Sequence, residues 1–380
     1  MSKRPNGEGT VFYDPKSKRF RAQFYDHEHK RRTLSSRTKS GIHKKLRDGI
    51  TARDAGFLSR KPSEIETLGD YLDSWHIIQS KAVWEFKTSE NIALDINRYI
   101  KPVLGHFRLD ALNPELITKA YSEIKELHDL SDASLNHVHR TLKTSLKSAV
   151  KMRKILVNPM DGVEAPRIRK GKVRVLEESD LLRLISSIKN GPIEWNALWR
   201  ITLLTGLRQG EVLGLTWENI NFANNTICVM QQLQRQTGNG LVLKRLKTDI
   251  DGRFIHLDSE TAVTLKRWKS EQASLKLQLR SWGENDLVFT NTIGKALEPR
   301  RSARKWAELL KQNGIEHIKL HGARHSFATW AIKNGFDIKV VSHYLGHSDI
   351  KTTISIYQHI TESSLTSAAT KMTKLLSIKA

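Results

Sequence analysis

The chain has 380 residues, 63 of them lysine or arginine and 40 of them acidic, which gives a formal net charge of +23 and a pI near 10. So basic a protein is expected to bind a polyanion, and nucleic acid is the leading candidate. No apolar run reaches the roughly 18 to 20 residues of a membrane-spanning helix, and the single cysteine, Cys228, excludes an internal disulfide and a thiolate metal cluster, so we expect a cytoplasmic protein without a membrane partner.

Residues 1–61 form the most basic segment, with 17 basic and 6 acidic side chains. Runs rich in aromatic and β-branched residues predict strands at 9–14, 19–26 and 30–36, followed by a helix near 37–55. Arg19 and Arg21 alternate with Phe20, so both arginines share one face of their strand. Because a three-stranded sheet is narrow enough to enter a major groove, we expect Arg19 and Arg21 to bind DNA; a solvated basic face is the alternative.

Residues 62–165 show helical periodicity and little strand signal, which predicts a helical bundle. The predicted helices lie at 70–78, 91–105, 114–127 and 134–155. Thr67 is placed to cap the first of them. A basic, Gly- and Pro-containing linker is expected at 166–172.

The last helix of this bundle combines an apolar stripe with a basic face. The stripe consists of Leu135, Val138, Leu142, Leu146 and Ala149. The basic residues recur at three- and four-residue spacing: Arg140, Lys143, Lys147, Lys151 and Lys154. We expect Arg140, Lys143, Lys147 and Lys151 to bind DNA phosphates, and a merely solvated face is an equal alternative.

Residues 173–380 predict a mixed, mainly helical domain. Helices are expected at 176–189, 193–205, 260–279, 299–312, 320–335 and 337–346, and strands at 225–232 and 253–257 around a Gly-containing hairpin. Gly206 is expected to end the second helix in a left-handed conformation. The fold class is therefore mainly α with small β elements (α+β), arranged in several domains.

Three motifs in this last domain contain residues suited to phosphate chemistry. They are TGLRQGE at 205–211, HGARH at 321–325 and LGHSDIKTTISIY at 345–357. Arg208 lies between two predicted helices, so it projects from a rigid corner, and Glu211 lies within reach to orient its guanidinium. Taken alone, this spacing more often marks a structural salt bridge.

His321 and Arg324 are three residues apart, so both lie on one face of their predicted helix. A guanidinium can hold two phosphate oxygens, and an imidazole beside it can accept a proton near neutral pH. His325 is expected to point elsewhere and to be structural.

His347 follows an expected helix end, and Tyr357 comes ten residues later in a short polar helix. A phenol with an ordinary pKa near 10 is a weak nucleophile at pH 7, and nearby cations would lower that pKa. The alternative for Tyr357 alone is a packed aromatic ring with a hydrogen-bonded hydroxyl.

Taken together, these motifs resemble those of the tyrosine recombinase family, specifically the lambda-type phage integrases. The resemblance covers about residues 173–360 and is carried by TGLRQGEVLGLTW, KTDIDGRFIHL, HGARHSFATW and LGHSDIKTTISIYQHI. It implies a catalytic set of Arg208, Lys247, His321, Arg324, His347 and Tyr357, with Glu211 in support. Lys244 competes with Lys247, which is preferred because KTDIDGRFIHL matches the family's lysine, threonine and following strand.

The resemblance implies a site-specific DNA recombinase that cleaves and rejoins strands through a 3′-phosphotyrosyl intermediate, and so integrates or excises a mobile element without metal, ATP or another cofactor. By layout, 1–61 would be an arm-type DNA-binding domain, 62–165 a core-site DNA-binding domain and 173–380 the catalytic domain with a C-terminal helix. Double-stranded DNA with core and arm sites is the expected partner. We expect a homotetramer on synapsed DNA in the cytoplasm of a bacterial host, associated with the nucleoid, and DNA-bending or directionality factors are candidate partners.

Two other functions are compatible with parts of this pattern. A type IB topoisomerase shares the chemistry but only relaxes supercoils, and the basic N-terminal segment argues against it. A DNA-binding regulator without enzymatic activity would be expected to lack Tyr357 or one of the arginines, and this chain has them all. The amphipathic segment after Tyr357 is expected to dock on its own domain or on a neighbouring protomer.

Overall fold

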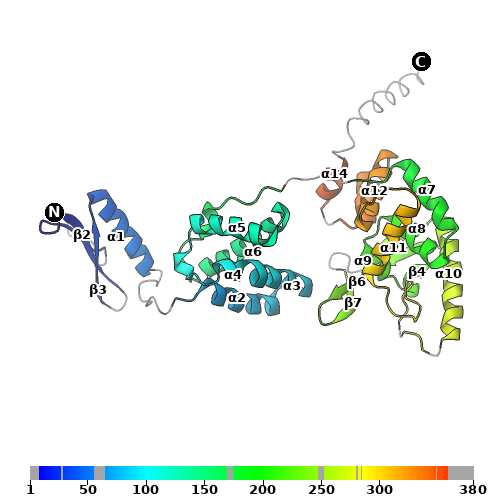
Figure 1. The fold of residues 1–380 in the computed structure, drawn as a ribbon, viewed down its shortest axis with the longest axis horizontal. Coiled ribbons are helices and arrows are strands. Elements are labelled where there is room, and N and C mark those ends of the chain that lie inside the picture. Colours follow the sequence, from blue (N-terminus) through cyan, green and yellow to red (C-terminus); the bar gives the residue numbers. More distant parts are fainter. Residues whose placement is uncertain are drawn as a thin grey trace, which may run out of the picture. The chain divides into compact units, whose positions relative to one another are not determined.

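The computed structural model describes residues 8–26, 29–54, 65–168, 174–246, 252–279, 281–283, 285–347 and 349–357. The chain divides into two compact units, residues 1–170 and 171–380 (Figure 1). Both units are built from helices and small antiparallel sheets, which confirms the predicted fold class. The predicted boundaries of three domains stay a prediction.

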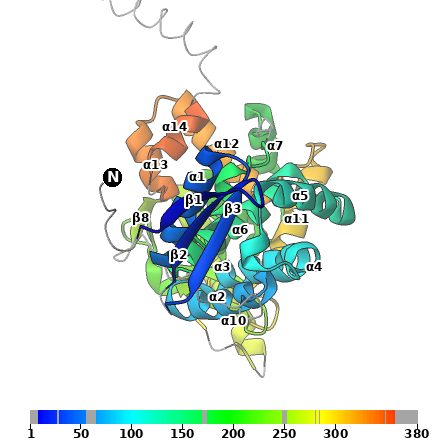
Figure 2. The same ribbon diagram turned by 90° about the vertical axis from the view of Figure 1, so that its left-hand side faces the viewer.

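The chain begins with a three-stranded antiparallel sheet in the order β1-β2-β3, covered on one face by a helix (Figures 1 and 2). These elements are β1 (Thr10–Asp14), β2 (Arg19–Tyr25), β3 (Arg31–Ser36) and α1 (Lys39–Asp54). Ala22 and Phe24 of β2 pack with Ile42 and Leu46 of α1, because alternate residues of a strand point to the same face. The predicted strands and helix are thus confirmed.

A helical bundle with its own apolar core follows. It contains α2 (Leu68–Ala82), α3 (Phe86–Leu94), a π-helical turn η2 (Asp95–Ile100), α4 (Lys101–Leu104), α5 (Pro114–His128) and α6 (Asp132–Lys151). Thr67 caps α2 as predicted, and its hydroxyl accepts from the backbone N–H of Asp70. The predicted apolar stripe of α6 is buried throughout.

Two predictions for this bundle were wrong in detail. The helix expected at 91–105 starts earlier, at Phe86, and contains the π-helical turn just before Pro102, which has no N–H to continue the ordinary ladder. Helix α6 ends at Lys151 because Arg153 takes a left-handed conformation (φ 55). Lys154 therefore leaves the basic face of the helix, and its ammonium pairs with Glu66 instead.

The second unit is mainly helical, as predicted. Its helices are α7 (Glu178–Lys189), α8 (Ile193–Thr205), α9 (Gln209–Leu213), α10 (Ser259–Gln278), α11 (Pro299–Gln312), α12 (Leu320–Lys333), α13 (Ile338–Leu345) and α14 (Lys351–Tyr357). Its strands form a sheet in the order β4-β5-β8, from β4 (Ile220–Asn221), β5 (Thr226–Val229) and β8 (Arg253–His256), and a hairpin of β6 (Gln231–Gln236) with β7 (Gly240–Arg245). The single strand expected at 225–232 is thus split at Met230 between two sheets.

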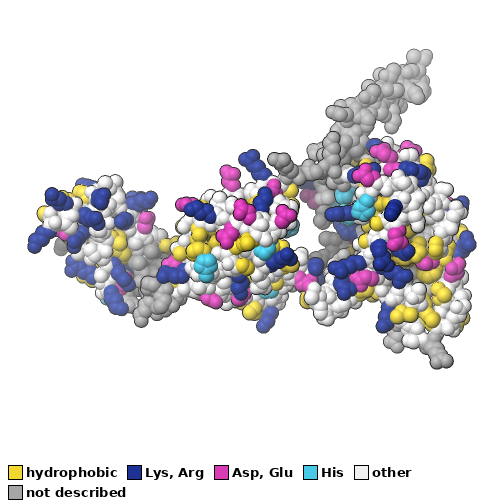
Figure 3. Space-filling model, in the orientation of Figure 1, with side chains coloured by type: hydrophobic (Ala, Val, Ile, Leu, Met, Phe, Trp, Pro, Cys, Tyr) yellow, Lys and Arg dark blue, Asp and Glu magenta, His cyan; other side chains and the backbone are white. Residues whose placement is uncertain are grey.

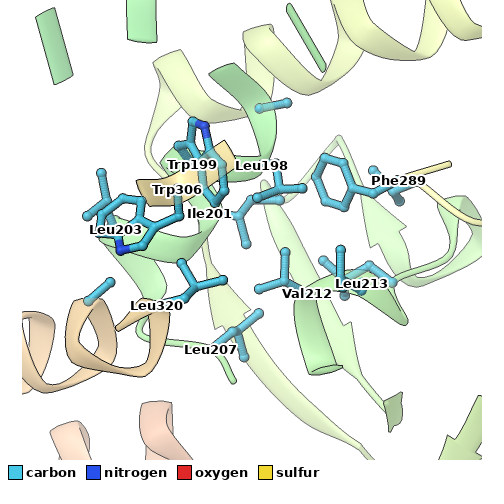
Figure 4. Close-up of a cluster of buried hydrophobic side chains, with 14 of the residues drawn as sticks. Leu198, Trp199, Ile201, Leu203, Leu207, Val212, Leu213, Phe289, Trp306 and Leu320 are labelled. Atoms are coloured by element: carbon cyan, nitrogen blue, oxygen red, sulfur yellow. The ribbon is translucent and has the colours of Figure 1, made fainter. Parts of the chain in front are cut away.

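The core of this unit surrounds α8 (Figure 4). Trp306 of α11 is fully buried, its ring centroid lies 5.4 Å from that of Trp199, and its indole N–H donates to the carbonyl of Ile318. This packing joins the middle of α8 to α11, and the indole hydrogen bond ties α11 to the segment just before α12. Within the residues that the structure describes, no helix is both long and apolar enough to span a bilayer.

Candidate active site

A cavity of about 280 Å³ opens where the ends of α8, α12 and α13 meet. It is lined by Arg208, His321, Arg324, His325, Leu345, His347 and Thr352. Four of the predicted catalytic residues, Arg208, His321, Arg324 and His347, therefore share one pocket although 139 positions of sequence separate the first from the last.

Arg208 is held at the corner that the sequence predicted. Gly206 ends α8 with a φ of 65°, and Arg208 is the residue just before α9. Its Nη1 donates to Oε1 of Glu211 at 2.8 Å, and its backbone N–H donates to Oε2 of the same carboxylate at 2.9 Å. Its Nη2 donates to the carbonyl of Gly346 at 3.2 Å, so the guanidinium is fixed from both sides.

Glu211 is shared with a second arginine, Arg253, for which the sequence motifs predicted no role. Its carboxylate is fully buried, and Oε2 also accepts from Nη2 of Arg253 at 2.9 Å. Arg253 is only 2% exposed and lies at the start of β8, on the same side of the strand as buried Ile255. An arginine at an inward strand position requires a buried acid, and that pattern is the signal that could have identified it.

Arg324 projects from α12 and is 4% exposed. Its Nη1 donates to the carbonyl of Gly206 at 2.9 Å and its Nη2 to that of Leu345 at 2.5 Å. These carbonyls belong to the C-terminal ends of α8 and α13, where unpaired oxygens and the helix dipoles favour a cation. Desolvation, followed by repulsion from Arg208, lowers the pKa of Arg324 to about 9, so the side chain stays charged at pH 7.

The histidines of α12 correct one prediction. His325 does not point away from the site: it lines the pocket, and its ring centroid lies 5.0 Å from that of His321 in an edge-to-face arrangement. Residues four apart on a helix share a face, which explains the proximity. Desolvation and then His325, Arg324 and Arg208 lower the pKa of His321, which favours its neutral, proton-accepting form.

His347 enters the pocket directly after Gly346, the left-handed residue (φ 61) that ends α13. Its Nδ1 lies 2.8 Å from the hydroxyl oxygen of Thr353. Desolvation, followed by the charges of Arg324 and Arg208, lowers the pKa of His347 to about 4. The imidazole is therefore neutral at pH 7.

Two predicted catalytic side chains lie outside what the structure describes. Lys247 belongs to the segment between β7 and β8 that is not described, whereas its competitor Lys244 is half-buried on β7 opposite Gln232. Tyr357 is the last residue of α14, which packs against α12 and α13, and its side chain is not among the described ones. The C-terminal helix expected after Tyr357 also lies beyond the described residues.

The residues predicted to bind DNA lie on exposed faces of the first unit. Arg19 and Arg21 lie on the sheet face opposite the core residues Ala22 and Phe24, and Nε of Arg21 is 2.9 Å from Asp14. The exposed cations of α6 are Arg140, Lys143, Lys147 and Lys151. Lysine and arginine side chains are spread over the visible surface of both units (Figure 3). In the described part of the chain, no group of three or more His, Cys, Asp or Glu residues is placed to hold a metal ion.

Residues 174–364 match the phage integrase family. The chain belongs to this family. It is thus a tyrosine recombinase. This integrase is 27% identical over 368 residues to an integrase of Saccharopolyspora erythraea, and the match covers 82% of each protein. It is also 27% identical over 300 residues to a XerC-like tyrosine recombinase of Caldanaerobacter subterraneus subsp. tengcongensis, covering 71% of this chain and 76% of that protein. Its fold resembles that of the Tn1549 transposon integrase in complex with transposon right end DNA, with a TM-score of 0.68, 21% identity, and coverage of 82% of this chain and 99% of that one.

Proposed function

We propose that this integrase recombines DNA at specific sites by attack of Tyr357 on a phosphodiester held in the pocket of Arg208 and Arg324. The observation that carries the proposal is the placement of two guanidiniums and three imidazoles around one cavity, each arginine being fixed by carbonyl or carboxylate oxygens. A phosphate anion is the ligand that such a pocket suits best.

The arginines would stabilise the negative charge that builds up on the non-bridging oxygens in the transition state. Each guanidinium has five N–H donors, so Arg324 keeps donors for a phosphate after binding the carbonyls of Gly206 and Leu345. Such fixed donors do not need to reorganise during the reaction, and losing one typically costs about 2.7 to 4 kcal/mol, or roughly a hundred- to thousandfold in rate. His347 would add a third donor.

The proton transfers follow from the same arrangement. The phenolic oxygen of Tyr357 forms a bond to phosphorus as His321 accepts its proton, and the bond from phosphorus to the 5′ oxygen breaks as Lys247 protonates that oxygen. The resulting 3′-phosphotyrosyl bond conserves the energy of the phosphodiester. A 5′-hydroxyl from another duplex can therefore reverse the reaction without ATP, and we assign no cofactor to it.

We place the protein on double-stranded DNA in the cytoplasm of a bacterial host, associated with the nucleoid. The exposed cations of α6 would bind the core site, and Arg19 and Arg21 would bind arm sites. Exchange between two duplexes requires four strand cuts, and each copy has one Tyr357, so a homotetramer on synapsed DNA is the smallest complete assembly. Integration or excision of a mobile element is the process such exchange serves, with DNA-bending or directionality factors as additional partners.

The proposal is tested by trapping the covalent intermediate. A core site is first selected from a random-sequence duplex library by binding to the Tyr357→Phe variant, which keeps the fold and the cations. The site is then made as a nicked duplex and incubated with wild-type protein in excess EDTA. We expect a covalent adduct that peptide mapping assigns to Tyr357, and none with Tyr357→Phe.

An adduct on a different residue, or cleavage that stops in EDTA, would contradict the proposal. A pair of duplexes carrying the site distinguishes recombination from simple relaxation of supercoils, because only a recombinase joins strands from both.

A further inference from the structure

Thr353 contacts His347 of the pocket, although it takes no part in the phosphate binding and proton transfers proposed for this integrase. Its hydroxyl oxygen lies 2.8 Å from Nδ1 of His347, and the residue is fully buried. Thr353 belongs to α14, four residues before Tyr357, and α14 packs against α12 and α13. A buried hydroxyl that is hydrogen-bonded to one imidazole nitrogen can determine which of the two ring nitrogens carries the proton.

A neutral imidazole carries one proton, so one of its nitrogens donates and the other accepts. With Nδ1 occupied by Thr353, Nε2 is the ring nitrogen left for a ligand in the pocket. If the hydroxyl donates to Nδ1, Nε2 carries the proton and can donate to a phosphate oxygen. If the hydroxyl accepts instead, Nε2 presents a lone pair that repels the same oxygen.

The surroundings of His347 keep its imidazole neutral, so the tautomer of the ring decides whether Nε2 can donate a hydrogen bond. Desolvation and the neighbouring Arg324 and Arg208 disfavour the imidazolium form, which would have an N–H on both nitrogens and need no help. The neutral ring is the form present at pH 7, and its tautomer is set by the partner of Nδ1.

We propose that Thr353 is a positioning residue whose hydroxyl donates to Nδ1 of His347 and so keeps Nε2–H directed at the phosphate. This inference rests on the proposed function, in which His347 donates to a non-bridging oxygen. Because Thr353 is on the helix that also contains Tyr357, the hydrogen bond exists only while that helix is docked. Docking of the nucleophile's helix therefore also prepares the donor.

The first test compares single-turnover rates of adduct formation on the selected nicked duplex. Thr353→Val replaces the hydroxyl by a methyl group of similar size and is expected to slow the reaction roughly 10- to 100-fold, by analogy with the loss seen when the partner that fixes the tautomer of a metal-binding histidine is removed. Thr353→Ser keeps the hydroxyl and is expected to react close to the wild-type rate. Thr202→Val is the matched control, because Thr202 is another buried threonine of the same unit, with its hydroxyl on the carbonyl of Leu198.

The second test reads the tautomer directly. We would record long-range ¹H–¹⁵N correlation spectra of the full chain labelled with ¹⁵N-histidine. The imidazole signals of His347 are assigned as those that disappear from the spectrum of His347→Gln. We expect an Nε2–H tautomer in the wild type and in Thr353→Ser, and a mixture of tautomers in Thr353→Val.

Three results would overturn the inference: wild-type cleavage by Thr353→Val, equal losses in Thr353→Val and Thr353→Ser, or an Nδ1–H tautomer in the wild type. Failure of wild-type protein to form any adduct would instead reject the proposed function, and the spectra would still decide whether Thr353 sets the tautomer. Melting temperatures of all variants separate a loss of folding from a loss of rate.

Discussion

Arg324 of the pocket is 4% exposed and donates to two backbone carbonyls, whereas Lys147 of α6 is an exposed side chain on a helix surface. The first cation is fixed before any DNA arrives, at the cost of burying its charge. The second can follow a phosphate backbone and release counterions as it does so. Fixed cations suit a transition state, which lasts too briefly for side chains to reorganise, and mobile cations suit affinity.

The largest effect is expected from the carboxylate that fixes the pocket. Glu211→Gln removes the buried negative charge that Arg208 and Arg253 both face. We expect the free energy of unfolding to fall by about 3 to 5 kcal/mol, because removing one member of a buried ion pair leaves the other charge desolvated. Chemical denaturation measures the change. Glu115→Gln, which breaks an exposed pair with Lys119, should leave the free energy of unfolding unchanged. Equal losses in both variants would show that the buried pocket charges contribute no more to stability than an exposed ion pair does.

Gly346 provides a smaller and more local test. Gly346 and Gly335 both have positive φ angles, 61° and 83°, so alanine at either position is strained by roughly 1 to 3 kcal/mol. A Cβ at 346 would also collide with the guanidinium of Arg253, whereas one at 335 has nothing within 4 Å. Gly346→Ala is therefore expected to lose more unfolding free energy than Gly335→Ala. Equal losses of unfolding free energy would mean that the Arg253 side chain can move aside, so that its contacts do not hold it rigidly in place.

The pocket should also be recognisable from its response to acid. The pKa of His347 is about 4 in the folded protein and about 6.5 in an unfolded chain. The unfolded state therefore binds more protons between these values, so the stability contributed by the neutral ring is complete above pH 6.5 and is lost as the pH falls toward 4. Unfolding experiments at pH 7 and pH 5 should show a smaller fall in stability for His347→Gln than for wild type. The same fall in stability in wild type and in His347→Gln would show that groups other than His347 cause the acid sensitivity.

The smallest effect belongs to the exposed helix face. Lys147→Gln should weaken binding to all DNA sequences alike and reduce the slope of log affinity against log salt by about 1. Lys119→Gln, on α5 of the same bundle and paired with Glu115, is the control and should leave the slope unchanged. Fluorescence anisotropy at several salt concentrations measures both, and an unchanged slope for Lys147→Gln would show that this face does not touch the backbone.

Local rules made several features of the fold predictable from sequence. The cap at Thr67 and the left-handed end at Gly206 follow from the chemistry of single residues, and the stripe of α6 follows from helical periodicity. The premature end of α6 at Arg153 was not predictable in this way, because no glycine marks the turn.

Within the site, the sequence placed Glu211 beside Arg208 because three residues separate them on one chain. Arg253 was missed because its partner Glu211 lies on another element and is brought close only by packing. Thr353 was missed although it is near His347 in sequence, because the turn between His347 and α14 decides whether the hydroxyl faces the imidazole. His325 was misjudged although its four-residue spacing from His321 contained the answer.

The most direct test of the account measures affinity and chemistry separately for Arg324→Lys and Lys147→Gln. Lysine keeps the charge at 324 but lacks the planar fork whose two terminal nitrogens bind the carbonyls of Gly206 and Leu345 separately. At saturating DNA we predict that Arg324→Lys cleaves the nicked duplex roughly a hundred- to thousandfold more slowly with near-normal affinity, and that Lys147→Gln binds less tightly but cleaves at the wild-type rate. Wild-type cleavage by Arg324→Lys, or a loss of rate by Lys147→Gln at saturation, would contradict the division between fixed and mobile cations.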